Sequence, residues 1–304
     1  MMENIERVCR HLHFKLSQIP GSNPAKETLT LQYTKNRQSF YLDEIGTYWR
    51  VFNCIEPHRT FDIADDRAKV EEAGRAYGRF MYLLSDLGGE PLHESIPNFH
   101  NIEMRLQKFH NALANGNKDR IKEAPAEIEL ILQQAEEMTL LSRLGKEGKI
   151  PVRITHNDTK INNILFSMEG KAMCVIDLDT VMPGFVHFDF GDAIRTFTNT
   201  AAEDEKDLSK VSMNLEYFES FAAGYLFSTR SMLSDEEKKH LAFSARYFTY
   251  LHVLRFLTDY IENDIYYKIH YPAHNLVRAR NQYALLKSME SCYPAMQKII
   301  STLS

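Results

Sequence analysis

The most constraining feature of this chain is a set of three short extended segments, broken by a polar loop, between positions 151 and 177. Pro151 to Thr155 predicts a first strand, Ile161 to Phe166 a second, and Ala172 to Ile176 a third that ends at Asp177. Glu169 and Gly170 predict a tight turn between the second and third strands. A hairpin through this turn would hold the polar groups at the ends of its two strands side by side.

The loop before that hairpin has the spacing of a phosphoryl-transfer site. His156, Asp158 and Asn163 follow the H-x-D-x-x-x-x-N pattern of the kinase catalytic loop, with Asn157 in place of its Arg. In such a loop the Asp accepts the proton of the attacking hydroxyl and the Asn binds magnesium. The alternative for Asp158 is a turn residue and for Asn163 a local cap.

The neighbouring polar residues extend this prediction. Asp177 is predicted to be the second magnesium ligand, because magnesium prefers hard oxygen donors. Lys160 is predicted to contact the γ-phosphate, the alternative being an ordinary surface charge. Asp179 lies two residues beyond Asp177. In a strand it would point the same way as Asp177, and it is predicted to be a further ligand or a substrate contact, with a structural acid as the alternative. His156 is expected to brace the loop rather than to act as an acid or base.

A second acidic motif lies farther along. Asp189-Phe190-Gly191 spells the kinase DFG triplet, but it follows a break at Pro183-Gly184, whereas Asp177 ends the strand expected to pair beside the loop. We therefore predict that Asp189 and Asp192 brace the loop or start a helix, with substrate contact as the alternative.

The composition narrows the class of protein. The chain has 304 residues, 44% hydrophobic and 25% charged, with a net charge of -5. This mild acidity is unfavourable for nucleic-acid binding, and no apolar run is long enough to span a membrane. The charged N-terminus does not predict a signal peptide, and the scattered cysteines suggest neither a disulfide framework nor a zinc site. We expect a protein of the reducing cytoplasm. The cysteines are Cys9, Cys54, Cys174 and Cys292.

The remaining periodicity predicts an α+β chain in two parts. Residues 1–58 contain one amphipathic helix, a break at Gly21 to Pro24, and about three extended runs, at 29–33, 39–42 and 48–55. Residues 59–304 are mainly helical, and a stripe from Val70 to Leu84 is preceded by a cap at Asp65 or Asp66. Further helices are predicted near 100–115, 125–145, 213–228 and 235–262.

Several longer segments of the sequence resemble those of a known family. The chain resembles the aminoglycoside phosphotransferase-like kinases, and within them the N-acetylhexosamine 1-kinases. The strings that match are Thr155 to Leu165, Val175 to Gly184, Phe188 to Arg195, Glu203 to Val211, Arg255 to Tyr260, Asp264 to Tyr266 and Tyr271 to Arg278.

The resemblance implies a fold and an activity. It implies a protein-kinase-like bilobal fold, ATP and magnesium as phosphate donor and metal, and transfer of the γ-phosphate to the anomeric hydroxyl of an N-acetylglucosamine or N-acetylgalactosamine type of sugar. Carried over, Asp158 corresponds to the base, Asn163 and Asp177 to metal ligands, and Arg255 and Tyr266 to sugar contacts. On their helical pattern alone, Arg255 and Tyr266 would favour packing at the edge of the core. Sugar and ATP are the partners implied, with no nucleic acid and no membrane.

The resemblance also implies a shortened small lobe. The first helix of this chain corresponds to the helix that follows a glycine-containing phosphate loop in the family, so we expect that loop and its lysine to be missing and ATP binding to be weak. Residues 1–58 would then be the remnant of the nucleotide lobe. Trp49, Ile55 and Glu56 are expected to form the hinge against adenine.

Two other functions stay open at this stage. One is a catalytically impaired protein that binds a sugar or a protein partner. The other is a kinase of another small alcohol, such as an aminoglycoside, choline or homoserine. A polycationic aminoglycoside needs a dense acidic pocket, and the only acidic cluster, Glu203 to Glu205 with Asp207, predicts a solvated loop.

Overall fold

The N-terminal helix forms as its periodicity predicts. The computed structural model describes residues 1–304, and its helix α1 (Met2–Ser17) buries one stripe that contains Ile5, Val8, Leu12 and Leu16. This stripe packs against α3 (Arg67–Leu84), which begins at the predicted cap: the Asp66 side chain accepts the backbone N–H of Lys69.

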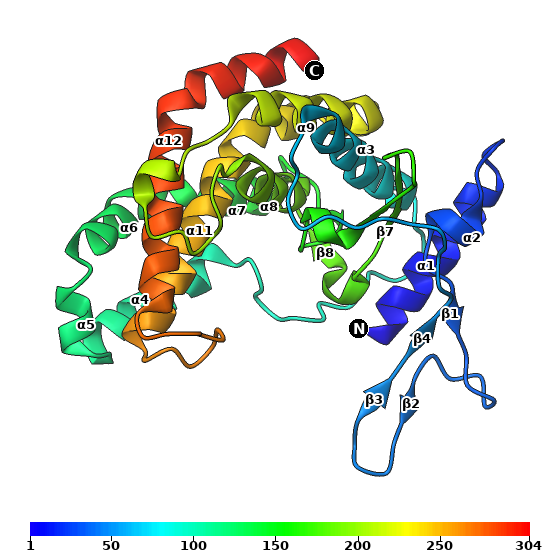
Figure 1. The fold of residues 1–304 in the computed structure, drawn as a ribbon, viewed down its shortest axis with the longest axis horizontal. Helices are drawn as coiled ribbons and strands as arrows, with labels where there is room; N and C mark the ends of the chain where they lie inside the picture. Colours follow the sequence, from blue (N-terminus) through cyan, green and yellow to red (C-terminus); the bar gives the residue numbers. More distant parts are fainter.

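The chain between α1 and α3 forms an arm of very short strands. Each of its strands is two residues long. β1 pairs with β4 and β2 pairs with β3, both antiparallel, and the β2–β3 hairpin projects away from the helices (Figure 1). The elements of the arm are α2 (Pro24–Glu27), β1 (Leu31–Gln32), β2 (Tyr41–Leu42), β3 (Tyr48–Trp49) and β4 (Val51–Phe52).

The rest of the chain is mainly helical. The helix predicted near 125–145 is two helices that join at Thr139, and the one predicted near 235–262 is divided at His240. The helices are α4 (Ile102–Asn115), α5 (Lys118–Lys122), α6 (Pro125–Met138), α7 (Leu140–Lys146), α8 (Val186–Thr198), α9 (Leu215–Thr229), α10 (Asp235–Lys239), α11 (Leu241–Ile261) and α12 (His274–Leu303).

Four short strands carry the motif region. β6 (Ile164–Phe166) and β7 (Ala172–Val175) form the predicted hairpin, with Ile164 opposite Val175. β5 (Arg153–Thr155) pairs with β8 (Met182–Gly184), so the segment predicted as a break at Pro183-Gly184 is an edge strand. The second strand is shorter than predicted. Three 3-10 turns occupy η1 (Ile161–Asn163), η2 (Leu178–Thr180) and η3 (Leu208–Lys210).

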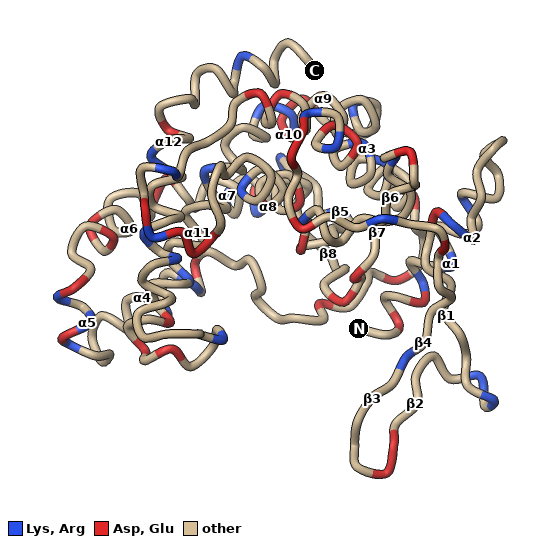
Figure 2. Tube along the Cα trace, in the orientation of Figure 1, with Lys and Arg blue, Asp and Glu red and all other residues tan.

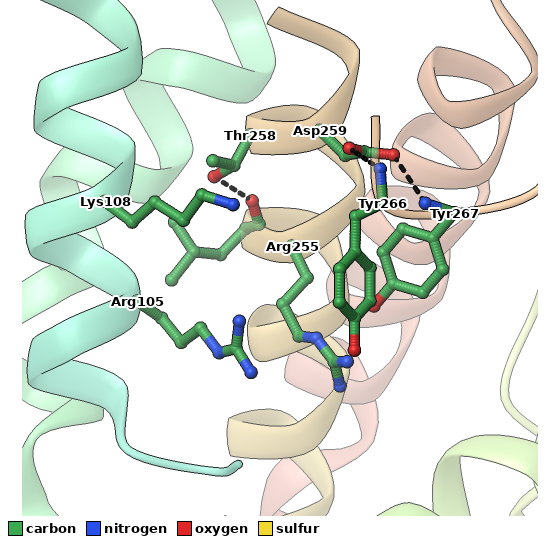
Figure 3. A pocket seen from close by; sticks show the side chains of 8 residues that line it. Arg105, Lys108, Arg255, Thr258, Asp259, Tyr266 and Tyr267 are labelled. Carbon is green, nitrogen blue, oxygen red and sulfur yellow. Dashed lines mark hydrogen bonds between the residues drawn. The ribbon is translucent and has the colours of Figure 1, made fainter. Parts of the chain in front are cut away.

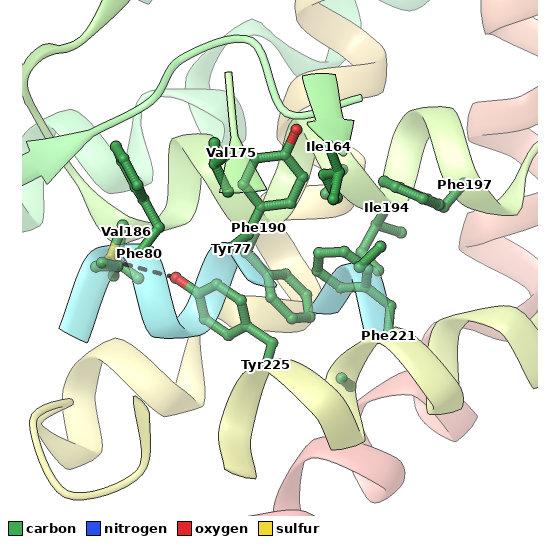
Figure 4. Close-up of a cluster of buried hydrophobic side chains, with 14 of the residues drawn as sticks. Tyr77, Phe80, Ile164, Val175, Val186, Phe190, Ile194, Phe197, Phe221 and Tyr225 are labelled. Atoms are coloured by element: carbon green, nitrogen blue, oxygen red, sulfur yellow. Dashed lines mark hydrogen bonds between the residues drawn. The ribbon is translucent and has the colours of Figure 1, made fainter. Parts of the chain in front are cut away.

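The main core lies where α3, α8 and α9 meet the hairpin. Phe190 of α8 makes edge-on contacts with Phe221 and Tyr225 of α9, and Tyr77 of α3 joins the same cluster (Figure 4). Helices α3 and α9 approach closely because glycines face backbone: a side chain on Gly224 would overlap the carbonyl oxygen of Glu71.

A second core surrounds α11, which packs on α4, α6, α8 and α12. Acidic and basic residues are interspersed along the helices (Figure 2). None of the helices combines the length and the apolar character needed to cross a bilayer. The arm joins the body where Arg59 and Phe166 exchange two backbone hydrogen bonds, of 2.8 and 2.9 Å. The division into parts at residue 58 stays a prediction.

Candidate active site

The predicted base and one predicted metal ligand are joined by a direct hydrogen bond. The side-chain amide of Asn163 donates to Asp158 Oδ2 and to the Asp158 backbone oxygen, each at 2.9 Å. Because the amide nitrogen faces Asp158, the Asn163 Oδ1 atom is left for another partner. Lys160 Nζ lies 2.9 Å from the same carboxylate oxygen, and about a third of the Asp158 side chain, 31%, is exposed. Asp158 is therefore both oriented and accessible.

The loop turns at Asn157. Its φ of +65° is in the left-handed region, which Asn tolerates better than most residues. The turn points the Asn157 amide inward, where it donates to the backbone oxygens of Thr155 and Thr180 at 3.2 and 2.9 Å. The Asn at this position, where the kinase pattern has Arg, is thus a structural residue of the loop.

Asp189 braces the loop from α8, as predicted. Its two carboxylate oxygens accept the backbone N–H groups of His156 and Asn157, both at 2.8 Å, and its backbone oxygen accepts the Thr159 hydroxyl at 2.7 Å. Burial raises the pKa of Asp189 to about 7, in spite of those two N–H donors. With both oxygens engaged and the side chain buried, the Asp of the DFG triplet is not available to a metal.

His156 is also a bracing residue. It is fully buried, its Nε2 lies 2.9 Å from the oxygen of Ile176, and its Nδ1 accepts the N–H of Asp158 at 3.3 Å. Burial lowers the pKa of His156, so the imidazole is neutral at pH 7. Its ring packs edge-on against Tyr77 and Phe80 of α3. The tyrosine hydroxyl in turn donates to the Lys160 oxygen at 2.7 Å.

The hairpin brings Asn163 and Asp177 together. The backbone N–H of Ile176 donates to the backbone oxygen of Asn163 at 2.9 Å. Asp177 therefore follows directly on the residue that pairs with Asn163. Asp177 is exposed, has a φ of +61°, and makes no side-chain hydrogen bond. An open carboxylate and an open amide oxygen are a donor set that fits Mg²⁺, which takes one or two protein oxygens and completes its shell with water and phosphate.

The expectation for the orientation of Asp179 is wrong. The left-handed backbone at Asp177 and the 3-10 turn that follows end the strand, so Asp179 does not share the direction of Asp177 through strand alternation. Instead, Asp179 Oδ1 lies 2.5 Å from Arg50 Nη2 in the arm. This ion pair ties the arm to the loop that carries the predicted metal ligands.

The predicted adenine hinge is dispersed in the structure. Trp49 lies on the projecting hairpin and is 58% exposed, and its ring N–H donates to Asp43 of the same hairpin at 2.8 Å. Ile55 is buried against Leu165 and Cys174, and Glu56 is exposed. The contacts of Trp49 are therefore local to the hairpin, and its role toward a nucleotide stays a prediction.

Arg255 and Tyr266 lie in one pocket beside α4 and α11. Figure 3 shows Arg255 from α11 and Arg105 from α4 extending into the same space, with Tyr266 and Tyr267 of the loop before α12 beside them. The Arg255 guanidinium lies 6.0 Å from the centre of the Tyr266 ring. The pocket is lined by Arg105, Lys108, Leu254, Arg255, Thr258, Asp259, Tyr266 and Tyr267.

Phe99 lies beside this pocket and also lines a second cavity, which reaches Asn157 of the predicted catalytic loop. The Phe99 ring, 5.4 Å from the Arg255 guanidinium, packs 4.3 Å from the ring of His100. His100 and Asn157 line a common cavity of about 450 Å³. A further cavity of about 300 Å³ opens beside Lys160 and is lined by Arg195 and Glu203.

Sequence patterns did not predict that Arg105 and Phe99 lie at this pocket, or that Glu203 pairs with Arg195. The predicted solvated acidic loop is partly wrong, because Glu203 binds the buried Arg195 at 2.8 Å and Asp204 faces His274 at 3.2 Å. No spacing could have shown these contacts, because Glu203 and Asp204 lie in the loop after α8, and sequence patterns do not predict how such a loop folds back onto α8 and α12. A second acid on Arg195, Asp192 at 3.0 Å, belongs to the same ion-pair network.

These elements place an oriented, accessible carboxylate beside open oxygen donors and a lysine, which is the set of groups predicted for phosphoryl transfer. The chain belongs to the phosphotransferase enzyme family, whose model matches residues 31–229, more than half of the chain.

Solved structures confirm the protein-kinase-like α+β fold. An aminoglycoside phosphotransferase from Alicyclobacillus acidocaldarius is 9% identical with a TM-score of 0.59, over 100% of this chain and 85% of that one. A choline/ethanolamine kinase family protein from Mesorhizobium loti is 15% identical with a TM-score of 0.57, over 99% and 84%. An ethanolamine kinase from Plasmodium vivax is 14% identical with a TM-score of 0.52, over 92% and 71%.

Proposed function

We propose that the protein is an ATP- and magnesium-dependent kinase that phosphorylates the anomeric hydroxyl of an N-acetylhexosamine, of the N-acetylglucosamine or N-acetylgalactosamine type. Phosphoryl transfer to an alcohol follows from the family and from the oriented Asp158 carboxylate. The hexosamine acceptor is supported by the resemblance of the strings around Arg255 and Tyr266, and by a pocket that combines guanidinium groups with aromatic faces.

The chemistry needs one proton acceptor and a means of neutralising charge. In the proposed reaction, the acceptor hydroxyl gives its proton to Asp158 as its oxygen forms a bond to the γ-phosphorus. The bond from that phosphorus to the β–γ bridging oxygen breaks, and ADP leaves. Asn163 holds the carboxylate toward the hydroxyl through its amide N–H.

The remaining residues act on the phosphates. Asn163 Oδ1 and the Asp177 carboxylate are the groups that would hold Mg²⁺, which supplies charge neutralisation at the phosphate oxygens when bound. Lys160, which pairs with Asp158, is placed to exchange that contact for a phosphate oxygen. The arm, tied to the metal loop by Arg50, is the proposed support of the adenine.

The test is phosphate transfer by this chain and by an Asp158→Asn variant. Each protein is incubated with ATP, magnesium and N-acetylglucosamine or N-acetylgalactosamine, and sugar 1-phosphate is identified by ³¹P NMR. General-base catalysis contributes on the order of 10²- to 10⁴-fold, so the variant should lose at least about 100-fold in kcat. Equal rates in the two proteins would exclude Asp158 as the base.

A parallel panel separates the other functions. Aminoglycosides, choline and homoserine replace the sugar under the same conditions, and turnover of one of these in place of the sugar would assign the chain to another small alcohol. Binding of N-acetylglucosamine in calorimetry without any turnover would instead identify a sugar-binding protein that lacks catalysis.

A further inference from the structure

Two arginines of the proposed acceptor pocket have no acidic partner. The Arg255 side chain makes no hydrogen bond or ion pair within the chain, and its Nε atom is buried. Arg105 donates only to the backbone oxygen of Phe99, at 3.0 Å, and its Nε atom is likewise buried without a partner. Burial and then the charge of Arg255 lower the pKa of Arg105.

Aromatic rings surround the Arg255 guanidinium. Its central carbon lies 5.4 Å from the Phe99 ring centre, 5.5 Å from that of Tyr267 and 6.0 Å from that of Tyr266. Such a group of ring faces is the arrangement with which proteins bind ammonium ligands. Here the cation that occupies it belongs to the protein.

The carboxylates near the pocket already have hydrogen-bond or ion-pair partners within the chain. Asp259 accepts the N–H groups of Tyr266 and Tyr267, at 2.8 and 3.0 Å, together with the amide of Asn275 at 2.8 Å. Glu262 lies 2.9 Å from Lys108.

Farther along the acceptor side, Glu203 binds Arg195 at 2.8 Å and Asp264 binds Arg120 at 2.6 Å. The charge of the side chains that line the pocket is therefore positive, although the whole chain has a net charge of -5. A cationic acceptor would meet two guanidinium groups and no available acid.

We propose that Arg255 and Arg105 select the acceptor by charge: the small pocket, of about 20 Å³, receives the acyl group of an N-acylated, uncharged sugar, whose amide oxygen the guanidinium groups bind, and rejects the corresponding free amine and other cationic alcohols. This inference rests on the proposed hexosamine kinase function and names the group that decides between its acceptors. A carbonyl oxygen can accept the unpartnered N–H groups, whereas an ammonium offers only donors. The ring faces that would bind the ammonium are taken by Arg255 itself.

The experiment compares N-acetylglucosamine with glucosamine at about pH 6, where the free amine is protonated, and includes choline. Like-charge repulsion in a partly desolvated pocket should make kcat/KM for glucosamine on the order of 100-fold lower than for N-acetylglucosamine. Arg255→Gln, which keeps a polar side chain without the charge, should reduce that ratio to about 10-fold or less. It should do so by raising KM for N-acetylglucosamine and by improving the use of glucosamine.

Two further variants control for structural effects. Arg255→Lys keeps the positive charge, so it should still reject glucosamine while its KM for N-acetylglucosamine rises. Arg143→Gln removes an exposed arginine of α7 outside the pocket and should leave the ratio unchanged. Thermal unfolding checks that each variant is folded.

The outcomes separate this inference from the proposed function. Wild-type protein that uses glucosamine or choline as well as N-acetylglucosamine would overturn the charge selection, as would an unchanged ratio in Arg255→Gln. If no N-acetylhexosamine is phosphorylated, the proposed activity fails, and the selection is judged by calorimetric binding of the same two sugars. Binding that does not differ between them, including no binding of either, overturns it.

Discussion

The side-chain amide of Asn163 donates a 2.9 Å hydrogen bond to the carboxylate of Asp158. One residue therefore orients the proposed base with its nitrogen while its oxygen stays open toward the proposed metal position. Base and metal ligand are coupled, and a change at Asn163 should affect both.

We expect Asn163→Ala to lower kcat on the order of 100-fold and to raise the magnesium concentration needed for half-maximal rate. Asn163→Asp should restore part of the metal dependence but not kcat, because a second carboxylate beside Asp158 repels it. Steady-state rates over a magnesium titration measure both effects. Asn115→Ala, at the exposed end of α4, is the matched control. A variant with reduced kcat and an unaltered magnesium requirement would show that Asn163 does not bind the metal.

The buried Asp189 should make stability depend on pH. Its folded pKa is about 7, raised from 3.8, so its contribution is present below about pH 4 and is lost as the pH rises toward 7. Asp189→Asn removes this titration, although the variant is itself destabilised because its amide N–H faces a backbone donor. The difference in unfolding free energy between wild type and variant should therefore be about 2–3 kcal/mol larger at about pH 5 than above about pH 7. Urea unfolding at the two pH values measures it, and a constant difference would contradict the assignment.

The ion pair between Arg50 and Asp179 should affect the arm more than the whole fold. Both side chains are partly exposed, 29% and 39%, so Arg50→Ala should change the unfolding free energy by less than about 1 kcal/mol. The same variant should make the arm more sensitive to limited proteolysis, because the ion pair ties the arm to the loop that carries the predicted metal ligands. Asp179→Asn and the double variant should have the same effect on proteolysis as Arg50→Ala. Additive effects of the two single variants would show that the residues act separately.

The contact between α3 and α9 depends on the absence of a side chain. Gly224→Ala would force its Cβ into the carbonyl of Glu71, and we expect a loss of at least about 1–3 kcal/mol in unfolding free energy. Gly88→Ala is the control, because open space surrounds that position. Denaturant unfolding compares the two, and a Gly224→Ala protein as stable as wild type would mean that the helices can separate without loss.

The sequence predicted the parts of the site that depend on local pattern. The β6–β7 hairpin follows from two apolar runs around Gly170, and the bracing role of Asp189 follows from its place after the Pro183-Gly184 segment. The direction expected for Asp179 is wrong because strand alternation does not apply beyond Asp177, whose left-handed backbone ends the extended segment. Alternation says nothing about where a strand stops.

Long-range contacts lay outside the reach of sequence patterns. Arg105 is on α4 and Arg255 on α11, and their common pocket exists because these helices pack together around the second core. Asn163 was predicted as a ligand alone, because spacing gives the identity of a residue but not the direction of its amide. The contacts of Trp49 with its own hairpin were hidden for the same reason.

The bracing of the catalytic loop separates two kinds of change in this protein. Asp189, Tyr77 and Thr180 hold the loop through hydrogen bonds of 2.6 to 2.8 Å from outside the proposed acceptor pocket. The pocket walls come from α4, α11 and the segment before α12. Under the proposed function, substitutions in those walls alter which alcohol is bound while the loop around Asp158 keeps its shape. A lineage that carries this fold can acquire new acceptors without having to rebuild its chemistry.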